Sequence, residues 1–414
     1  MNNLNEIKEF RNNDAVVTIC SLNYVHKAIV LLDSYHQFNP EDSCYLLIVD
    51  KKREFLFPEN NFFKIIWVED LFNEEFYSYA FTFDVLEFNT NVKPRVLKYL
   101  LSNHDKAIYL DPDIQVFAPL DCVKNELIES SIVITPHYTK PIIDNHKPTD
   151  LDLLKFGAYN LGFVGVSKTD EAFAFLDWWG ERCLDYGFYE PQSGLGVDQK
   201  WIDLAPSFFP NLKILRHPGL NVAFWNLHER TLSKDISTYF VNREYPLIFF
   251  HFSSFSENNP EIIASKQSRF EPGSREDIKI LFNDYATLVK TSKFYKFKNE
   301  RYSFDYFEDG LYITPMLRRI HSITTDLELK KENPFLYNSG FRRFANSLGL
   351  VKKRNSQIKR YTFKNMDQFK KQEAFIFLML RVFLKIVGPG RYFNFMRYLG
   401  YISSIRNQQK VFNK

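Results

Sequence analysis

Short apolar runs rich in β-branched residues alternate with helical patterns along the first third of the chain. The runs are AVVTIC at 15–20, CYLLIV at 44–49 and FKIIWV at 63–68, and a helical pattern extends from 26 to 37. Short, continuous apolar runs are typical of strands buried on both faces. The pattern therefore predicts the α/β class, with a Rossmann-like, mostly parallel sheet flanked by helices.

The alternation of strand and helix patterns continues to about residue 250. We expect helices at 93–101 and 171–185, and strands at 106–110, 131–135, 161–166 and 247–252. Near residue 330 the chain changes character. Basic clusters at 342–343 and 352–354 precede an apolar helix, a break at Gly388-Pro389-Gly390 and a final aromatic helix, because Gly and Pro together interrupt helices. We therefore predict an α/β domain over 1–330 and a basic, aromatic helical region over 331–414.

The net charge of +3 conceals an uneven distribution of charge. Residues 341–414 contain 17 Lys and Arg but only Asp367 and Glu373, a net charge of +15, so the preceding residues carry −12. A basic, aromatic tail on an acidic body indicates an anionic partner surface. On charge alone, nucleic acid and phospholipid both remain open.

Composition and cysteine usage narrow the class of protein. Hydrophobic residues at 45% and charged residues at 25% are ordinary globular values, which excludes intrinsic disorder. The four cysteines lack CxxC spacing, so we expect reduced, mostly buried thiols in a reducing compartment. The segment MNNLNEIKEFRNND lacks the apolar stretch of a signal peptide, and no run reaches the roughly 18 apolar residues of a spanning helix. We therefore expect a cytoplasmic location.

The sharpest local motif is the run YLDPDI at 109–114. Asp111 and Asp113 follow a predicted strand, and Pro112 between them fixes the direction of the turn. Open α/β sheets bind ligands at the carboxyl ends of their strands. Carboxylate oxygens there suit Mg²⁺ or Mn²⁺ bridging a diphosphate. The alternative is a strand-end turn in which Asp caps the next segment.

His251 adds an imidazole at the end of the run LIFFHF, and beside two carboxylates it suits Mn²⁺. Four segments in this order, YLDPDIQVF, AYNLGFVGV, GVDQKWIDL and FFHFSSF, resemble metal-dependent GT-A glycosyltransferases. The resemblance is to the family 8 transferases, such as glycogenin and the lipopolysaccharide sugar transferases, and to enzymes of bacterial surface-polysaccharide clusters. It covers about residues 14–270 and implies a GT-A catalytic domain within 1–330.

The resemblance implies an activity and roles for individual residues. The chain would move a sugar from a nucleotide-sugar donor, UDP-linked, to a glycan or lipid-linked saccharide acceptor. The metal, Mn²⁺ or Mg²⁺, would be held by Asp111, Asp113 and His251. Catalytic roles fall on Asp198, Gln199 and Lys93, of which Lys93 would contact the DxD carboxylates or the donor. Donor-binding roles fall on Thr18, Cys20, Asn23, Tyr24, Asp111, Asn160 and Gly162, and the acceptor side is assigned to His217, Asn221, Trp225 and Asn226.

Several of these residues also have plain structural explanations. Lys93 could be a solvated lysine at a helix start, and Tyr24 a core aromatic. Gly162 could serve close backbone packing, and Asp198 with Gln199 could cap a helix that begins at Gln199.

One departure from the family pattern concerns the phosphates. Family 8 members place a glycine and then a lysine soon after HF, whereas here Ser253, Ser254 and Phe255 follow, so we expect Lys266 and Arg269 to supply charge to the phosphates. A divalent cation and a basic residue stabilise the departing diphosphate. The resemblance favours retention of configuration at the transferred sugar, with the leaving phosphate as the base. Asp198 fits a retaining or an inverting reaction, so the sequence leaves both open.

The basic tail leaves a choice of partner and of function. Residues 372–406 mix aromatic, aliphatic and basic side chains, which favours a pair of interfacial helices on an anionic membrane, peripheral at the inner face of the plasma membrane. The alternative is a helical cap on the catalytic domain. No nucleic-acid module accompanies the charge, so nucleic acid is not expected. The rival functions are a non-catalytic sugar-nucleotide- or glycan-binding scaffold and a metal-dependent nucleotidyl- or phosphotransferase.

Overall fold

The structure is a computed structural model that describes residues 13–53, 57, 62–351 and 370–412. By its internal contacts the chain divides into two compact units. Unit 1 contains the residues up to Asn73 and Val85–Ser303, and unit 2 contains Glu74–Asp84 and the residues from Phe304 onward. The predicted boundary at residue 330 lies within α11 (Leu327–Lys331), a short helix of unit 2.

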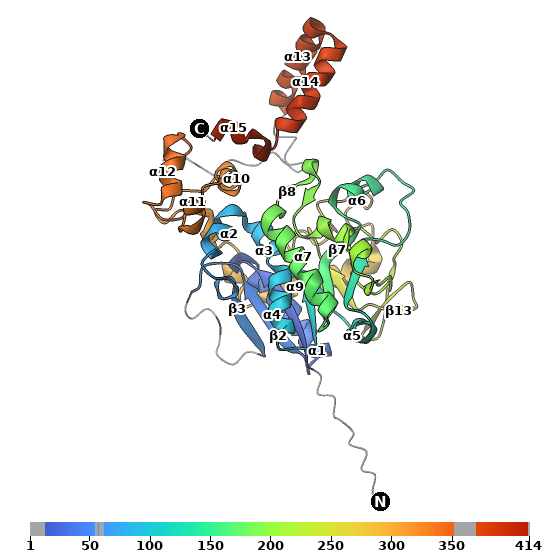
Figure 1. Cartoon of the computed structure of the whole chain (residues 1–414). Coiled ribbons are helices and arrows are strands. Elements are labelled where there is room, and N and C mark those ends of the chain that lie inside the picture. Colours follow the sequence, from blue (N-terminus) through green and yellow to red (C-terminus); the bar gives the residue numbers. More distant parts are fainter. Residues whose placement is uncertain (1–12, 54–56, 58–61, 352–369, 413–414) are drawn as a thin grey trace, which may run out of the picture. The chain divides into compact units, whose positions relative to one another are not determined.

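A seven-stranded sheet forms the centre of unit 1 (Figure 1), with the strand order β10-β6-β7-β4-β1-β2-β3. Neighbouring strands are parallel except at β7, which runs antiparallel to both β4 and β6. The predicted α/β class with a mostly parallel sheet is therefore confirmed. The strands are β1 (Asp14–Cys20), β2 (Ser43–Ile48), β3 (Phe63–Trp67), β4 (Lys106–Leu110), β6 (Ile132–Pro136), β7 (Tyr159–Ser167) and β10 (Leu212–Ile214).

Strand β1 illustrates why the apolar runs occupy the middle of this sheet. All seven of its residues are buried, because β2 and β4 pair with its two edges and both of its faces are covered. Helix α1 (Val25–Phe38) shares a core with Val16 and Cys20, and α4 (Lys93–Leu101) packs against β4 and α7 (Asp170–Tyr186). The other helices of unit 1 are α3 (Val85–Asn91), α5 (Asp121–Glu129), α6 (Asp150–Phe156), α8 (Ala205–Phe208) and α9 (Glu276–Thr291), with 3-10 turns η1 (Leu22–Tyr24), η2 (Val68–Leu71), η3 (Pro191–Ser193), η4 (Gln199–Asp203) and η5 (Tyr295–Phe297).

A two-stranded ribbon beside the sheet positions the residues of interest. After β4 and a short turn, β5 (Ile114–Val116) pairs antiparallel with β14 (Phe249–His251). The strand predicted at 247–252 therefore exists but is shorter, and it lies in this ribbon and not in the large sheet. Two further small sheets pair β8 (Tyr189–Glu190) with β9 (Leu195–Gly196), and β12 (Thr238–Val241) with β11 (Leu232–Asp235) and β13 (Tyr245–Pro246).

Unit 2 is helical in the part of it that the structure describes. Arg318 is 1% exposed and donates hydrogen bonds to the carbonyls of Ala80, Phe81 and Phe83 at the end of α2 (Phe76–Thr82). These bonds join the segment 74–84 to a unit otherwise built from later residues. The turn η6 (Ser303–Asp305) begins at the last residue of unit 1. The other elements of unit 2 are α10 (Pro315–Ile323), α11, α12 (Gly340–Ser347), α13 (Lys370–Val387), α14 (Pro389–Ile402), η8 (Ile405–Gln408) and α15 (Gln409–Phe412).

The predicted apolar and aromatic helices near the C-terminus are present as α13 and α14. Gly388 joins them with a φ of 80°, a conformation that glycine adopts without strain. Most large apolar side chains of this α13–α14 hairpin are exposed, and no described helix has the length and apolar character to cross a membrane. The basic cluster at 352–354, which was predicted to precede the apolar helix, lies outside the described residues. Exposures of 45–76% are found at Phe375, Ile376, Phe377, Leu378, Met379, Val382, Ile386, Phe393, Tyr398 and Tyr401.

Candidate active site

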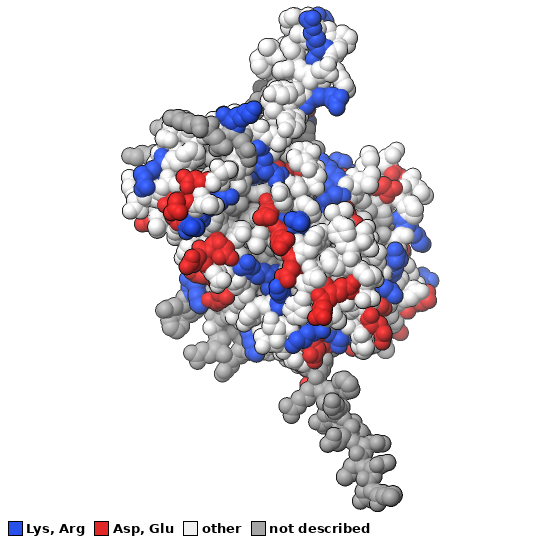
Figure 2. Space-filling view, viewed as in Figure 1, with Lys and Arg blue, Asp and Glu red and all other residues white. Residues whose placement is uncertain are grey.

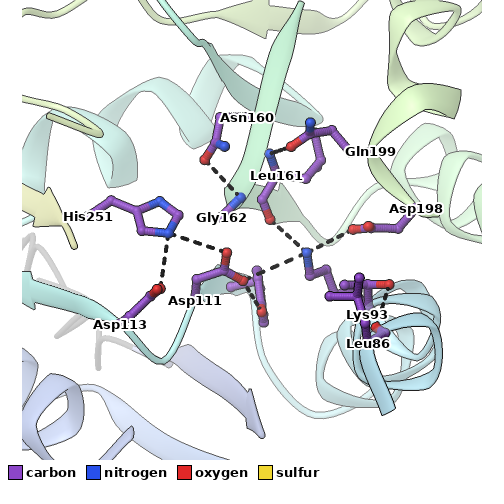
Figure 3. A network of polar contacts seen from close by, with 12 residues as sticks. Leu86, Lys93, Asp111, Asp113, Asn160, Leu161, Gly162, Asp198, Gln199 and His251 are labelled. Atoms are coloured by element: carbon purple, nitrogen blue, oxygen red, sulfur yellow. Dashed lines mark hydrogen bonds and ion pairs between the residues drawn. The ribbon is translucent and has the colours of Figure 1, made fainter. Parts of the chain in front are cut away.

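Three side chains that can ligate a metal converge where β4 and β14 end (Figure 3). Asp111 and Asp113 follow β4 directly, and His251 is the last residue of β14, where it lies opposite Ile114 of β5. His251 Nε2 is 3.0 Å from Asp113 Oδ1 and 3.5 Å from Asp111 Oδ2. One ligand atom from each residue lies within 4.8 Å of the other two. Two carboxylates and an imidazole at this spacing fit a divalent cation such as Mn²⁺.

The charges of this cluster stabilise one another. Burial raises the pKa of Asp113, but the charge and hydrogen bond of His251 outweigh it and lower that pKa to about 2. Burial lowers the pKa of His251, and Asp113 and Asp111 outweigh that effect and raise it. A bound divalent cation would take the place of the imidazole proton, because a His ligand must be deprotonated.

Asn221 fixes which nitrogen of His251 faces the carboxylates. Its amide nitrogen donates to Thr135 Oγ1 at 2.9 Å and to Asn160 Oδ1 at 3.0 Å, so its amide oxygen faces the imidazole. His251 Nδ1 lies 3.3 Å from that oxygen and donates to it. The Nε2 atom is thereby left for Asp111, Asp113 or a metal, and metal-ligating histidines have such a partner on the other nitrogen.

Gly162 leaves room for the His251 ring. A Cβ at Gly162 would lie 2.4 Å from His251 Cε1, which no side chain can tolerate. Asn160 Oδ1 accepts a hydrogen bond from the backbone N–H of Gly162 at 3.1 Å. Asn160 and Gly162, which the resemblance assigned to donor binding, therefore lie against the imidazole, which agrees with close packing as the reason for glycine.

Lys93 and Asp198 form a buried ion pair beside the carboxylates. Lys93 Nζ donates to Asp198 Oδ2 at 2.8 Å and to the Leu161 carbonyl at 2.9 Å, and it lies 3.8 Å from Asp111 Oδ1. Burial lowers the pKa of Lys93, but Asp198 and Asp111 outweigh it and raise that pKa. Because Lys93 is only 2% exposed, it is not a solvated lysine at a helix start; its charge connects Asp198 to Asp111.

The pair Asp198 and Gln199 does not act as a helix cap. Asp198 precedes η4 but makes no capping hydrogen bond with its side chain. Gln199 Oε1 accepts from the Leu161 N–H at 3.1 Å, and its Nε2 donates to the Phe156 carbonyl at 3.0 Å. Both side chains are thus directed toward β7 and the centre shown in Figure 3.

Four of the residues predicted to bind the donor, in and after β1, differ in accessibility. Thr18 and Cys20 lie inside β1 and are 0% and 2% exposed. Asn23 is partly exposed and accepts a hydrogen bond from Ser21 Oγ at 2.6 Å. Tyr24 is 43% exposed, so it is not a core aromatic. Of the four, Asn23 and Tyr24 have surface to offer a ligand.

Three of the four residues predicted on the acceptor side gather around His251. Asn221 and Asn226 are fully buried, and Asn226 Nδ2 donates to the Asn221 carbonyl at 2.9 Å. The ring centroid of Trp225 is 5.1 Å from that of His251. His217 has a local partner instead: its Nδ1 accepts a hydrogen bond from the backbone N–H of Gly219 at 3.1 Å. A contact of these residues with an acceptor remains a prediction.

Two further residues of the candidate active site, Tyr109 and His137, were not predicted from the sequence. The Tyr109 hydroxyl donates to Asp111 Oδ1. His137 Nε2 lies 3.3 Å from the amide nitrogen of Asn160, and burial lowers the pKa of His137 to about 4, so its neutral ring accepts that hydrogen bond. Both residues lie at or just after the carboxyl end of a predicted strand, which is the signal that could have identified them.

Comparison with known proteins gives the following similarities. No family model matches this chain. The uncharacterized protein YfnF of Bacillus subtilis (strain 168) is 25% identical over 248 residues, which cover 58% of this chain and 81% of YfnF. The uncharacterized protein YfnD of the same strain is 25% identical over 255 residues, which cover 58% of this chain and 77% of YfnD. Among solved structures, the galactosyltransferase LgtC in complex with donor and acceptor sugar analogs is matched over 67% of this chain and 96% of LgtC, at 15% identity and a TM-score of 0.41.

Proposed function

We propose that this protein is a metal-dependent glycosyltransferase that transfers a sugar from a UDP-linked donor to a glycan or lipid-linked saccharide in cell-surface polysaccharide synthesis. One observation carries the proposal. A ligand set for a divalent cation, Asp111, Asp113 and His251, lies against the buried Lys93–Asp198 pair, with Asp111 common to both. The resemblance of the four motifs to GT-A glycosyltransferases supports the choice of donor.

The chemistry follows from the charge of the leaving group. Breaking the bond between a sugar and a nucleoside diphosphate leaves negative charge on the departing phosphate, and a Mn²⁺ or Mg²⁺ held by the three ligands would neutralise it. Lys93 Nζ lies 3.8 Å from Asp111 Oδ1, and the Tyr109 hydroxyl donates a hydrogen bond to the same carboxylate oxygen. The ligands are therefore oriented before the donor binds, which lowers the reorganisation needed during the reaction.

We favour retention of configuration at the transferred sugar. Inversion requires a carboxylate that can accept the proton of the acceptor hydroxyl. Asp198 is 1% exposed and already accepts from Lys93, so it is poorly suited to that role. In this proposal the leaving phosphate is the base, and Asp198 with Gln199 positions the transferred sugar.

Release of nucleoside diphosphate from a panel of nucleotide sugars tests the function. We expect release from at least one donor with Mn²⁺ or Mg²⁺, and none with Asp113→Asn. Full activity in excess chelator would contradict the metal role. Nucleotide binding without any product would favour a non-catalytic scaffold. Products of phosphate or nucleotidyl transfer would favour a metal-dependent nucleotidyl- or phosphotransferase.

We also propose that the α13–α14 hairpin docks on the anionic inner face of the plasma membrane, where a lipid-linked acceptor would be presented. Its exposed apolar side chains alternate with the exposed basic residues Arg381, Lys385, Arg391 and Arg397, and Glu373 is the one acidic residue in the sequence of the hairpin. The hairpin in Figure 2 is accordingly white with blue groups toward its tip. Apolar side chains with basic neighbours suit the interface of anionic lipid.

A further inference from the structure

Lys27 is a buried lysine in the first turn of α1, just after the carboxyl end of β1. It is 7% exposed, and its Nζ lies 5.0 Å from the ring centroid of Tyr24. Among the residues that the structure describes, this ammonium group has no hydrogen bond and no ion pair. An ammonium group has three N–H donors, so Lys27 has its donors available to a ligand.

Among the described residues, the carboxylates that interact with the charge of Lys27 include those of Asp113 and Glu257, and neither lies within ion-pair distance of it. Burying a charged group without a partner costs free energy. The first turn of a helix carries partial positive charge, which repels a lysine, and the first turn of α1 contains no acidic residue that could compensate. An anionic ligand would remove both penalties.

The charge of Lys27 acts on the metal-binding cluster. After His251, Lys27 is a further positive charge that lowers the pKa of Asp113. Burial and then the charge of Asp113 raise the pKa of Tyr24. Strands β1 and β4 are parallel neighbours, so the segment after β1 that carries Tyr24 and Lys27 lies at the same edge of the sheet as Asp111 and Asp113, although Lys27 and Asp113 do not form an ion pair.

Other basic side chains near this region have acidic partners. Arg269, which the sequence favoured for the phosphates, donates to both carboxylate oxygens of Asp144 at 2.9 Å. Lys298 forms an ion pair with Glu257, a carboxylate whose pKa the charge of Lys27 also lowers, and Lys93 forms an ion pair with Asp198. Unlike these basic residues, Lys27 forms no ion pair with any residue that the structure describes.

We propose that Lys27 binds a phosphate of the donor diphosphate, with the Tyr24 ring holding the lysine side chain in place. This assignment rests on the proposed function. The phosphate would lie between Lys27 and a cation held by Asp113.

Calorimetry with the full chain tests this assignment, with UDP and uridine as probes in the presence of Mn²⁺. Lys27→Met is expected to weaken UDP binding by about 10- to 100-fold, the loss of one charge-assisted hydrogen bond. Uridine binding should be unchanged, and Lys27→Arg should retain UDP binding. The control is Lys234→Met, because Lys234 also lies over a tyrosine ring, 4.7 Å from the centroid of Tyr239. Lys27→Gln is a second neutral variant if the methionine variant does not fold.

The outcomes separate this assignment from the function on which it rests. Equal UDP affinity in wild type and Lys27→Met overturns the role of Lys27 alone. An equal loss for UDP and uridine also overturns it, because the effect would then be structural. If the wild type binds none of UDP, GDP, ADP and CDP with Mn²⁺ or Mg²⁺, the nucleotide-sugar function fails and the role of Lys27 fails with it.

Discussion

Replacing Asn221 by glycine tests whether the amide behind His251 sets the affinity for metal. Asn221 has a φ of 50°, and glycine adopts positive φ without strain. The change therefore removes the amide without forcing a new backbone conformation. His251 loses the acceptor for its Nδ1–H, so its ring is free to rotate or to change tautomer.

The contacts of Asn221 set the expected size of the effect. Removing an outer partner of a metal-ligating His lowers metal affinity by about 10- to 100-fold. The variant also loses contacts of 2.9, 3.0 and 3.3 Å, which cost about 1 kcal/mol of folding free energy each. A control must therefore remove a buried amide away from the ligands. Asn91→Ala does so, because the buried Asn91 amide donates to the Gly187 carbonyl at 2.8 Å, and the smaller loss of stability from this one hydrogen bond is measured alongside.

The assay is a Mn²⁺ titration at neutral pH, in which electron paramagnetic resonance measures the free ion. Thermal unfolding of each variant gives the accompanying loss of stability. We expect Asn221→Gly to bind Mn²⁺ about 10- to 100-fold more weakly than wild type, and Asn91→Ala to bind it unchanged. Wild-type affinity in Asn221→Gly would refute the positioning role. An equal loss in Asn91→Ala would refute it as well, since general destabilisation would then explain the effect.

Three further predictions concern packing, charge and pH. Gly162→Ala should weaken Mn²⁺ binding in the same titration, because its Cβ would lie 2.4 Å from His251 Cε1; unchanged binding would show that the ring can move at no cost. Arg381→Glu combined with Lys385→Glu should abolish flotation with anionic vesicles while donor hydrolysis in solution persists, and flotation that survives would contradict docking through charge. Burial lowers the pKa of His321 to about 3, so the folded chain keeps this imidazole neutral while the unfolded chain binds a proton below about pH 6.5. Its contribution to stability is complete above that pH and is lost as pH falls toward 3, and thermal unfolding of His321→Gln should show a weaker loss between pH 6.5 and 4 than wild type.

The fold could be predicted best where burial leaves a clear pattern. The helix Lys93–Leu101 and the strand Lys106–Leu110 have the predicted bounds, because the strand is almost wholly buried and the helix has an apolar face. The short strand Leu212–Ile214 is only partly buried, so it carries no apolar run and was missed. For 247–252 the pattern indicated a strand but not its partner, because partner choice depends on contacts far apart in the sequence.

The candidate site, like the fold, could be predicted where its residues follow a local sequence pattern and not where it depends on contacts between distant segments. Asp111, Asp113 and His251 could be grouped because each marks the end of an apolar run. Asn221 was predicted on the acceptor side, and the contact of its side chain with Thr135, 86 residues away, was not predicted. Neither residue lies in a pattern that reveals the other, so only the folded chain brings the pair together.

The balance of charge at the centre links the metal to the proposed role of Lys27. Three carboxylates, those of Asp111, Asp113 and Asp198, face the ammonium of Lys93 and the imidazole of His251. A divalent cation that displaces the imidazole proton adds one net positive charge. The cation and the Lys93 ammonium then balance the three carboxylates, which leaves little attraction for an incoming diphosphate. The additional positive charge must come from nearby, and Lys27 at the positive end of α1 supplies it. The metal and Lys27 should therefore make separate contributions to diphosphate affinity, so removing both should weaken binding more than removing either one.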